Sequence, residues 1–414
     1  MNYDYVLKSR ALPREKRVDV WLLLSCVLLA AFSMFMFLRA YQFTDSDIHA
    51  HANIAADFDF TDLHSITSRL AYPLWHLIVA VIYKLGVPLA WASALVCTAC
   101  KVSGMLLTHR LLRVMTDDCV HRNVITALSL ALMLVMGICI PSINRHVYRP
   151  VGSPNVWHNP TQLAVIVTML LLVPYTMHCW YEFTRARDAG DKKYVLPWRK
   201  VLALAVLSMA SLACKPTFMQ AFLPAAAIFF AVGWAFNIKQ WRYFLQIILA
   251  FVPAALYFLL QYLYYTGVVV PFTSGVCVLF NDYTIKETHR SVLILSACPL
   301  FAVIACFRKG MFKDRQLILC LLMIAVSAAE SMVFRETGMR ENHGNFYWAG
   351  MTASLMLWIE MAGVYTRDVT AYFKSEHKNV VRGVGYALVF ILFLWHLGSG
   401  LFYPYSIISR GASF

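Results

Sequence analysis

The sequence carries little charge for its length. Only 14% of its 414 residues are charged and 60% are hydrophobic, whereas about 25% of the residues in soluble domains are charged, because their surface faces water. There is no tandem repeat and no low-complexity tract. The net charge of +14 comes without any basic run interleaved with aromatic residues. It therefore indicates Lys and Arg in cytoplasmic loops near anionic lipid, and does not indicate nucleic-acid binding.

Patterns of metal binding, disulfides and signal cleavage are also lacking. The 11 cysteines lie mostly in apolar segments, and the Cys97–Cys100 pair sits in one of them, where packing explains it. No Cys/His spacing typical of a metal site occurs. The basic residues 1–17 precede the apolar run Trp21–Leu38, which is too long for a signal peptide and has no small-x-small cleavage site after it. We expect an uncleaved signal anchor.

Long apolar runs dominate what remains. A helix needs about 20 apolar residues to cross the hydrocarbon core, and we expect about eleven spans and an all-α transmembrane bundle. The expected spans lie at 18–38, 88–109, 124–141, 160–183, 200–214, 217–236, 243–265, 290–307, 316–334, 345–366 and 383–402.

The distribution of basic residues predicts the topology. Lys and Arg gather in 1–17, 184–200, 308–315 and 367–382, and such segments are expected in the cytoplasm. All of them fall on one side if Tyr72–Gly86, which is short for a span, lies along the external surface. The same model makes 198–236 a hairpin that turns at Lys215-Pro216, since Pro breaks helices.

This topology divides the chain into three parts. Residues 1–17 form a cytoplasmic tail, and 18–240 form a transmembrane module whose first external loop, 39–87, contains the surface-lying helix. Residues 241–414 form the C-terminal transmembrane helices. The N-terminus is predicted to be cytoplasmic and the C-terminus external.

Acidic and histidine side chains cluster just after the first span. Asp45, Asp47, His49 and His51 follow one another there. Ionisable groups at a membrane boundary are costly to desolvate and are commonly functional. We therefore predict a functional site in this loop, although polar loop residues can also simply face water.

Further polar residues fall on the same side. Lys215 at the hairpin tip either snorkels to the headgroups or holds a lipid phosphate. Arginines match phosphate geometry with paired donors. Asn159 and Pro160 suit the cap and first turn of a helix. The candidate substrate-binding residues on this side, besides His49 and His51, are Arg149, His158, Lys215, Arg335, Arg340 and His343.

Taken together, these features resemble the GT-C superfamily of membrane glycosyltransferases, which use polyprenyl-phosphate sugars. The resemblance rests on Phe43-Thr44-Asp45-Ser46-Asp47 after the first span, on the long first external loop, and on the surface helix that opens with Tyr72-Pro73-Leu74-Trp75-His76. It covers the architecture of about the first 240 residues. Two departures leave the sugar and the acceptor open: there is no long extracytoplasmic domain, and the second external loop matches no motif of the superfamily.

The resemblance implies an inverting sugar transfer on the non-cytoplasmic face. A polyprenyl-phosphate sugar is the expected donor, and a lipid or glycan the expected acceptor. Asp45 would deprotonate or orient the acceptor hydroxyl, with Asp47 as its helper. The cationic side chains would stabilise the phosphate leaving group. A divalent cation held by Asp45 and Asp47 is left open, since hard cations take carboxylate oxygens.

Other classes of membrane protein remain open on the residues alone. A transporter or flippase of a lipid-linked intermediate would need ionisable groups inside the membrane, and Lys101 and Glu330 lie within expected spans. A polysaccharide polymerase or ligase usually concentrates its polar residues in a late loop, whereas this chain concentrates its acids in the first. A purely structural membrane subunit is the third alternative.

The predicted topology can be tested by cysteine labelling in a Cys-depleted variant. We expect an impermeant reagent added outside the cell to label Ser46→Cys and Ser413→Cys but not Ser9→Cys, because only the first two positions are predicted to be external. Lys84→Cys should also react from outside. Labelling of Ser9→Cys alone would reverse the orientation, and a cytoplasmic Lys84→Cys would mean that Tyr72–Gly86 crosses.

Overall fold

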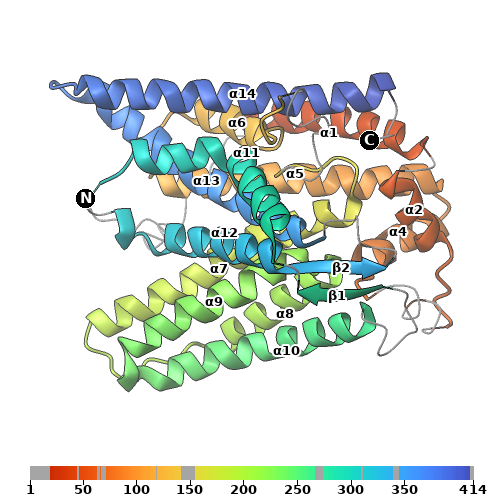
Figure 1. Ribbon diagram of the computed structural model, residues 1–414, viewed down its shortest axis with the longest axis horizontal. Helices are drawn as coiled ribbons and strands as arrows, with labels where there is room; N and C mark the ends of the chain where they lie inside the picture. Colours follow the sequence, from red (N-terminus) through yellow and green to blue (C-terminus); the bar gives the residue numbers. More distant parts are fainter. Residues whose placement is uncertain are drawn as a thin grey trace.

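The computed structural model describes residues 19–43, 46–62, 66, 71–117, 119–140, 154–265, 274–278, 280–308, 311–338 and 345–410. These residues form a helical bundle (Figure 1). Its helices are α1 (Val20–Tyr41), α2 (Asp47–Ala56), α4 (Leu74–Lys84), α5 (Leu89–Thr116), α6 (Arg122–Leu132), α7 (Pro160–Asp188), α8 (Trp198–Cys214), α9 (Thr217–Ala235), α10 (Trp241–Tyr265), α11 (Asp282–Ala305), α12 (Arg315–Val333), α13 (Asn345–Lys374) and α14 (Val380–Arg410), with short 3₁₀ turns η2 (Ile238–Gln240) and η3 (Met311–Lys313).

Beside the helices runs one two-stranded antiparallel sheet. Its strands β1 (Ser274–Val278) and β2 (Phe334–Gly338) pair Ser274 with Gly338 and Val278 with Phe334. β1 precedes α11 and β2 joins α12 to the segment before α13. The sheet therefore ties together two connections between the helices.

Eight helices in the described part of the chain are long and apolar enough to cross a membrane: α1, α5, α7, α9, α10, α11, α12 and α14. Large apolar side chains on them, such as Leu24 of α1 and Leu256 of α10, are exposed, as lipid contact requires. The prediction of a polytopic helical membrane protein is confirmed. The other three expected spans also contain helices, namely α6, α8 and α13, and the count of about eleven spans stays a prediction.

The expected hairpin at Lys215-Pro216 is confirmed. α8 ends at Cys214 and α9 begins at Thr217. Pro216 is tolerated at the start of α9 because the first N–H groups of a helix have no intrahelical acceptor, so the N–H that proline lacks would make no helical hydrogen bond. The predicted cap of α7 is also confirmed, since Asn159 accepts a hydrogen bond from the backbone N–H of Gln162 and Pro160 is the first helical residue.

The segment predicted as the span 124–141 differs from expectation. Its helix, α6, has 11 residues and ends at Leu132. Irregular backbone is tolerated at membrane depth only where other groups satisfy it, and here they do. The N–H groups of Met136, Ile138 and Cys139 donate to the His396 carbonyl (3.2 Å), the Ile294 carbonyl (3.1 Å) and the Ser399 hydroxyl (3.0 Å).

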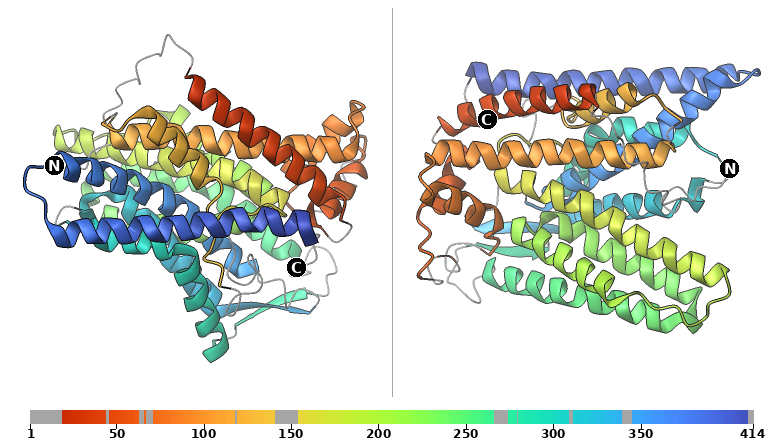
Figure 2. Two further views of the ribbon diagram at one scale, coloured as in Figure 1. Left: turned by 90° about the horizontal axis from the view of Figure 1, so that it is seen from above. Right: turned by 180° about the vertical axis from the view of Figure 1, so that it is seen from behind.

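The two ends of the bundle differ. α2, α4 and the β1–β2 sheet lie at one end, which we call the α2–α4 end, whereas the α7–α8 and α13–α14 connections lie at the other (Figures 1 and 2). These last connections carry the basic segments 184–200 and 367–382. α4 has 11 residues, which rise about 16 Å, too little to cross a core of about 30 Å. The side of the membrane that each end faces stays a prediction.

α14 approaches the irregular segment after α6 so closely that only glycine fits. A Cβ on Gly400 would lie 1.8 Å from the carbonyl oxygen of Leu134, whereas a Cβ on Gly398 would meet nothing within 4 Å. We expect Gly400→Ala to lower stability by about 1–3 kcal/mol, the usual cost of overpacking. Gly398→Ala should be neutral or slightly stabilising, because Ala suits a helix better than Gly. Thermal unfolding of the purified protein measures both, and equal melting temperatures would contradict this packing.

Candidate functional site

α2 places one carboxylate at the α2–α4 end of the bundle. Ser46 caps the helix, its hydroxyl accepting from the Ile48 N–H at 3.2 Å, and Asp47 is the first helical residue. An acidic residue suits this position, because the unpaired N–H groups of the first turn carry partial positive charge. The Asp47 side chain is 43% exposed, so a ligand can reach it.

The segment before α7 supplies the amide that faces this carboxylate. The Asn159 oxygen accepts from the Gln162 N–H (3.0 Å) and the Thr161 hydroxyl (2.9 Å). Its amide nitrogen is thereby left to donate to Asp47 Oδ2 at 2.8 Å. The two donors to the oxygen settle which end of the amide faces Asp47. The cap of α7 thus orients a hydrogen bond to the acid of α2.

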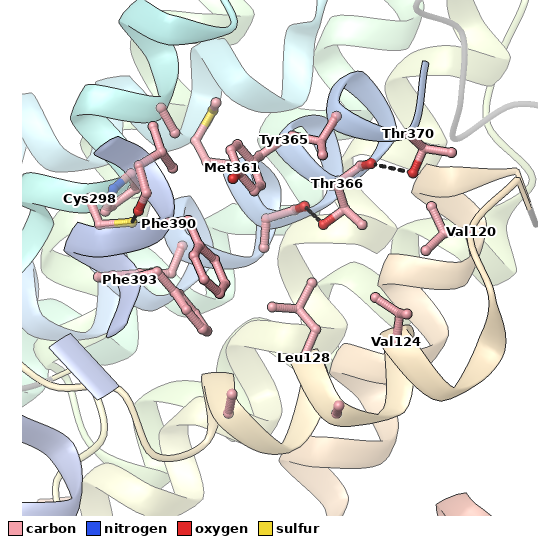
Figure 3. A pocket seen from close by; sticks show the side chains of 18 of the residues that line it. Val120, Val124, Leu128, Cys298, Met361, Tyr365, Thr366, Thr370, Phe390 and Phe393 are labelled. Carbon is pink, nitrogen blue, oxygen red and sulfur yellow. Dashed lines mark hydrogen bonds between the residues drawn. The ribbon is translucent and has the colours of Figure 1, made fainter. Parts of the chain in front are cut away.

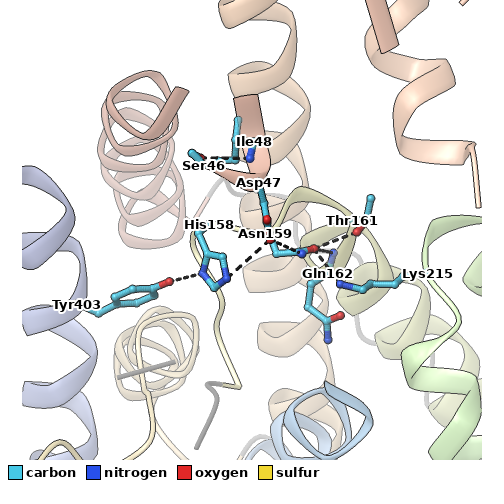
Figure 4. A network of polar contacts seen from close by, with 9 residues as sticks. All are labelled: Ser46, Asp47, Ile48, His158, Asn159, Thr161, Gln162, Lys215 and Tyr403. Atoms are coloured by element: carbon cyan, nitrogen blue, oxygen red, sulfur yellow. Dashed lines mark hydrogen bonds and ion pairs between the residues drawn. The ribbon is translucent and has the colours of Figure 1, made fainter. Parts of the chain in front are cut away.

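Lys215 points into the protein and does not reach for the headgroups. Its side chain lies among α7, α9 and α13 and is only 6% exposed. The ammonium donates to the Asn159 oxygen at 3.2 Å and lies 4.2 Å above the Trp348 ring. Figure 4 shows Asp47 and Lys215 on opposite sides of the Asn159 amide. Snorkelling, one of the two readings from sequence, does not describe this lysine.

His158 flanks the carboxylate from the other side. Its Nε2 lies 3.9 Å from Asp47 Oδ2, and its Nδ1 hydrogen-bonds with the Tyr403 hydroxyl of α14. Burial lowers the pKa of His158 to about 4, although the Asp47 charge acts in the opposite direction. The imidazole is therefore neutral at pH 7, and Tyr403 fixes the orientation of its ring.

His51 lies one turn after Asp47 on the same face of α2, since residues four apart in a helix are neighbours. Its Nδ1 is 2.8 Å from His76 Nε2 of α4. Burial lowers the pKa of His51 to about 4, so it too is neutral at pH 7. The pair joins α2 to α4 and closes one side of the cluster.

With His51 and His158 neutral, the charged side chains of this cluster are one anion, Asp47, and one cation, Lys215. Loss of solvation raises the pKa of Asp47, but His158, His51, Lys215 and the Asn159 hydrogen bond lower it by more, so the net shift is downward. Burial lowers the pKa of Lys215 to about 8, while Asp47 raises it. At pH 7 Asp47 is ionised and Lys215 is mostly protonated, with a neutral amide between them.

The remaining predicted residues are placed differently. His49 turns toward α1, where its Nδ1 donates to the Tyr41 carbonyl at 3.1 Å. Arg335 lies in β2 opposite Cys277 and is not among the contacts of Asp47 and Lys215 described above. Four predicted residues lie outside the described part of the chain: Asp45, Arg149, Arg340 and His343.

Other members of the cluster were not predicted. Asn159 was expected only as a cap, and the Asn159-Pro160 signal gave no hint of its bond to Asp47. Tyr403 and Trp348 come from distant helices and have no local signal. Behind Asn159, the Gln162 side-chain oxygen accepts from Thr217 at 3.0 Å, and its nitrogen donates to Thr352. These bonds hold α7, α9 and α13 together beneath the site.

Among the described residues, no group of three or more His, Cys, Asp and Glu side chains is placed to hold a metal ion. The described cluster is instead an ionised carboxylate in front of a buried ammonium. Such a pair can accept a proton from a hydroxyl group and can favour a ligand that carries negative charge.

Comparison of the sequence with protein-family models and with curated proteins finds no match.

The buried ammonium makes a testable prediction about pH. The pKa of Lys215 is about 8 in the folded protein and has an ordinary value of 10.5. Between these two pH values the unfolded chain holds a proton that the folded protein does not, so stability should rise with pH. We expect this rise in the wild type but not in Lys215→Met, as measured by thermal unfolding at pH 7 to 10. Because Asp47 raises this pKa, Asp47→Asn should start the rise at lower pH. Parallel profiles for wild type and Lys215→Met would contradict the burial of a charged lysine.

Proposed function

We propose that the protein is a GT-C-like glycosyltransferase that moves a sugar from a polyprenyl-phosphate donor to a lipid- or glycan-linked acceptor. One observation carries the proposal: at the α2–α4 end of a membrane bundle, the ionised and partly exposed Asp47 is held against Asn159 with the Lys215 ammonium behind it. Further support comes from the order of elements, since two short helices, α2 and α4, lie between the first two long apolar helices, α1 and α5.

The transfer we propose is a direct displacement. The acceptor hydroxyl attacks the anomeric carbon, the bond from that carbon to the donor phosphate oxygen breaks, and the phosphate leaves with the bonding electrons, inverting the configuration. The hydroxyl proton passes to a carboxylate. We assign this role to Asp47, which is ionised and accessible, with Asp45 as its partner or alternative. Because the pKa of Asp47 is lowered, its carboxylate is unprotonated when the acceptor binds.

The role we propose for Lys215 follows from its burial. With 6% of its surface exposed, it contributes positive charge from behind the site and orients the Asn159 amide, so it is a positioning residue. Positive charge at short range in a site of low dielectric stabilises the departing phosphate more than it would in water. Direct contact with the phosphate falls to the expected arginines Arg149, Arg335 and Arg340.

A transporter of a lipid-linked intermediate is the second candidate, and one observation favours it. Lys101 of α5 and Glu360 of α13 are both buried inside the bundle, and ionisable groups within spans often mark transport pathways. Lys101, however, is held by the Met133 carbonyl at 3.0 Å and by Asn155 at 3.2 Å, which is a structural role. The two functions differ in their product, because a transporter leaves the donor chemically unchanged.

The decisive experiment incubates the purified protein with a panel of polyprenyl-phosphate sugars and an acceptor lipid extract. We expect consumption of one donor and release of its polyprenyl phosphate. Asp47→Asn should reduce the turnover by about 10²–10⁴-fold, the usual contribution of a general base, while donor binding persists. Asp57→Asn, at the other end of α2 and exposed, is the matched control and should retain activity.

The variants also assign the roles. An active Asp47→Asn together with an inactive Asp45→Asn would move the base to Asp45. If both stay active, or if the donor moves between leaflets without being consumed, the glycosyltransferase proposal fails and the transporter is favoured.

A further inference from the structure

A large apolar groove lies away from the candidate site. It has a volume of about 900 Å³ and is lined by α6, α11, α13, α14 and the connection before α6 (Figure 3). Its lining runs to Thr370, near the end of α13, and to His121, just before α6 begins. The groove therefore occupies the half of the bundle opposite the α2–α4 end. It lies alongside α6, between this helix and α11, α13 and α14.

Four polar side chains in the wall of the groove donate hydrogen bonds to backbone carbonyls. The hydroxyls of Thr366 and Thr370 donate to the carbonyls four residues earlier at 2.6 and 2.8 Å. Tyr365 donates to the Tyr386 carbonyl at 2.8 Å, and the Trp358 indole donates to the Leu295 carbonyl at 3.0 Å. Ordered water needs several polar partners, and this wall offers few. The groove is thus suited to hydrocarbon.

The length of the groove matches one leaflet. Its lining on α13 runs from Trp358 to Thr370, and on α14 from Val389 to Leu397. At 1.5 Å per residue these stretches rise roughly 18 and 12 Å, which brackets half of a core of about 30 Å. Val124 and Phe390, at its rim, are 48% and 51% exposed, so the groove opens to the lipid that surrounds the spans.

The charge of the residues at the His121 end of the groove, which we call its mouth, indicates which lipid headgroup would lie there. His121 lines the groove just before α6 and is exposed, and the exposed Arg122 follows it in the chain. None of the lining residues, all of them described, is Asp or Glu. Basic side chains at this depth attract the phosphate of a phospholipid. The candidate site lies at the other end, so a donor whose sugar reaches Asp47 would have its phosphate far from this mouth.

We propose that the groove is a lipid-binding site that holds one acyl chain of a phospholipid from the leaflet opposite the α2–α4 end, with the headgroup beside Arg122. An unfilled recess would forfeit the dispersion contacts of its walls. A chain lodged in it contacts four helical segments, whereas a lipid on a flat helix contacts one, so the lodged lipid should exchange more slowly. The proposal is independent of the chemistry proposed at Asp47.

The test measures phospholipid that stays with the purified protein after prolonged washing in detergent. We expect stoichiometric phospholipid on the wild type and loss of it in Ala127→Trp, because Ala127 lines the groove and the indole would occupy it. Ala31→Trp is the matched control, since Ala31 is likewise an exposed alanine but lies on α1. It should retain the lipid.

A second measurement keeps the test valid if Ala127→Trp does not fold. Wild-type protein in vesicles of phosphatidylcholine and phosphatidylglycerol receives a trace of phospholipid with a photoreactive acyl chain. Adducts should concentrate on Val124 and Phe390 over Leu24 of α1, which is exposed to a similar degree, at 54%. Equal labelling of the three positions, equal lipid retention in all variants, or recovery of a polyprenyl phosphate in place of phospholipid would overturn the proposal.

Discussion

The candidate site depends on one amide. Asn159 caps α7 with its oxygen and meets Asp47 with its nitrogen, and the same oxygen accepts from Lys215. Every group that orients Asp47 from α7 or from the α8–α9 hairpin therefore acts through this side chain. The neutral amide of Asn159 thus lies between the Asp47 carboxylate and the Lys215 ammonium, and the two charged groups do not pair directly. A carboxylate that was directly paired with Lys215 would be less available to a hydroxyl group.

The bilayer imposes the second constraint, because every backbone group inside it needs a partner. The chain leaves helical geometry after Leu132, and α14 and α11 then provide the missing partners. Lys101 connects this segment to the site. Its ammonium donates to the Met133 carbonyl and lies 4.2 Å above the ring of Trp157, the residue directly before His158. The irregular segment and the site are thus both built against α14, which supplies His396 and Ser399 to the first and Tyr403 to the second.

The fold was largely predictable, because the signals for spans are local. Apolar runs located the long helices, and Lys215-Pro216 located the hairpin. The break in α6 was not predictable, because 133–140 is as apolar as a span and departs from helix only through partners such as His396 and Ser399 of α14.

In the site, Asp47, His51, His158 and Lys215 were predicted and lie together. His49 does not join them, because it lies two residues from His51 and therefore on another face of α2. Asn159, Trp348 and Tyr403 take part through tertiary contacts that local patterns do not encode.

The place of Lys215 at the tip of a tight hairpin has a consequence for membrane insertion. α8 and α9, with 17 and 19 residues, are joined by two residues. On the predicted topology, their shared turn crosses the bilayer during insertion and takes its lysine with it. A lysine at the centre of an inserting helix costs about 2.5–3.5 kcal/mol. Asp47 and Asn159 precede Lys215 in the chain and are made first, whereas Trp348 follows it. The polar partners of Lys215 are thus already synthesised when the lysine is made, whereas the aromatic ring that covers it is made afterwards.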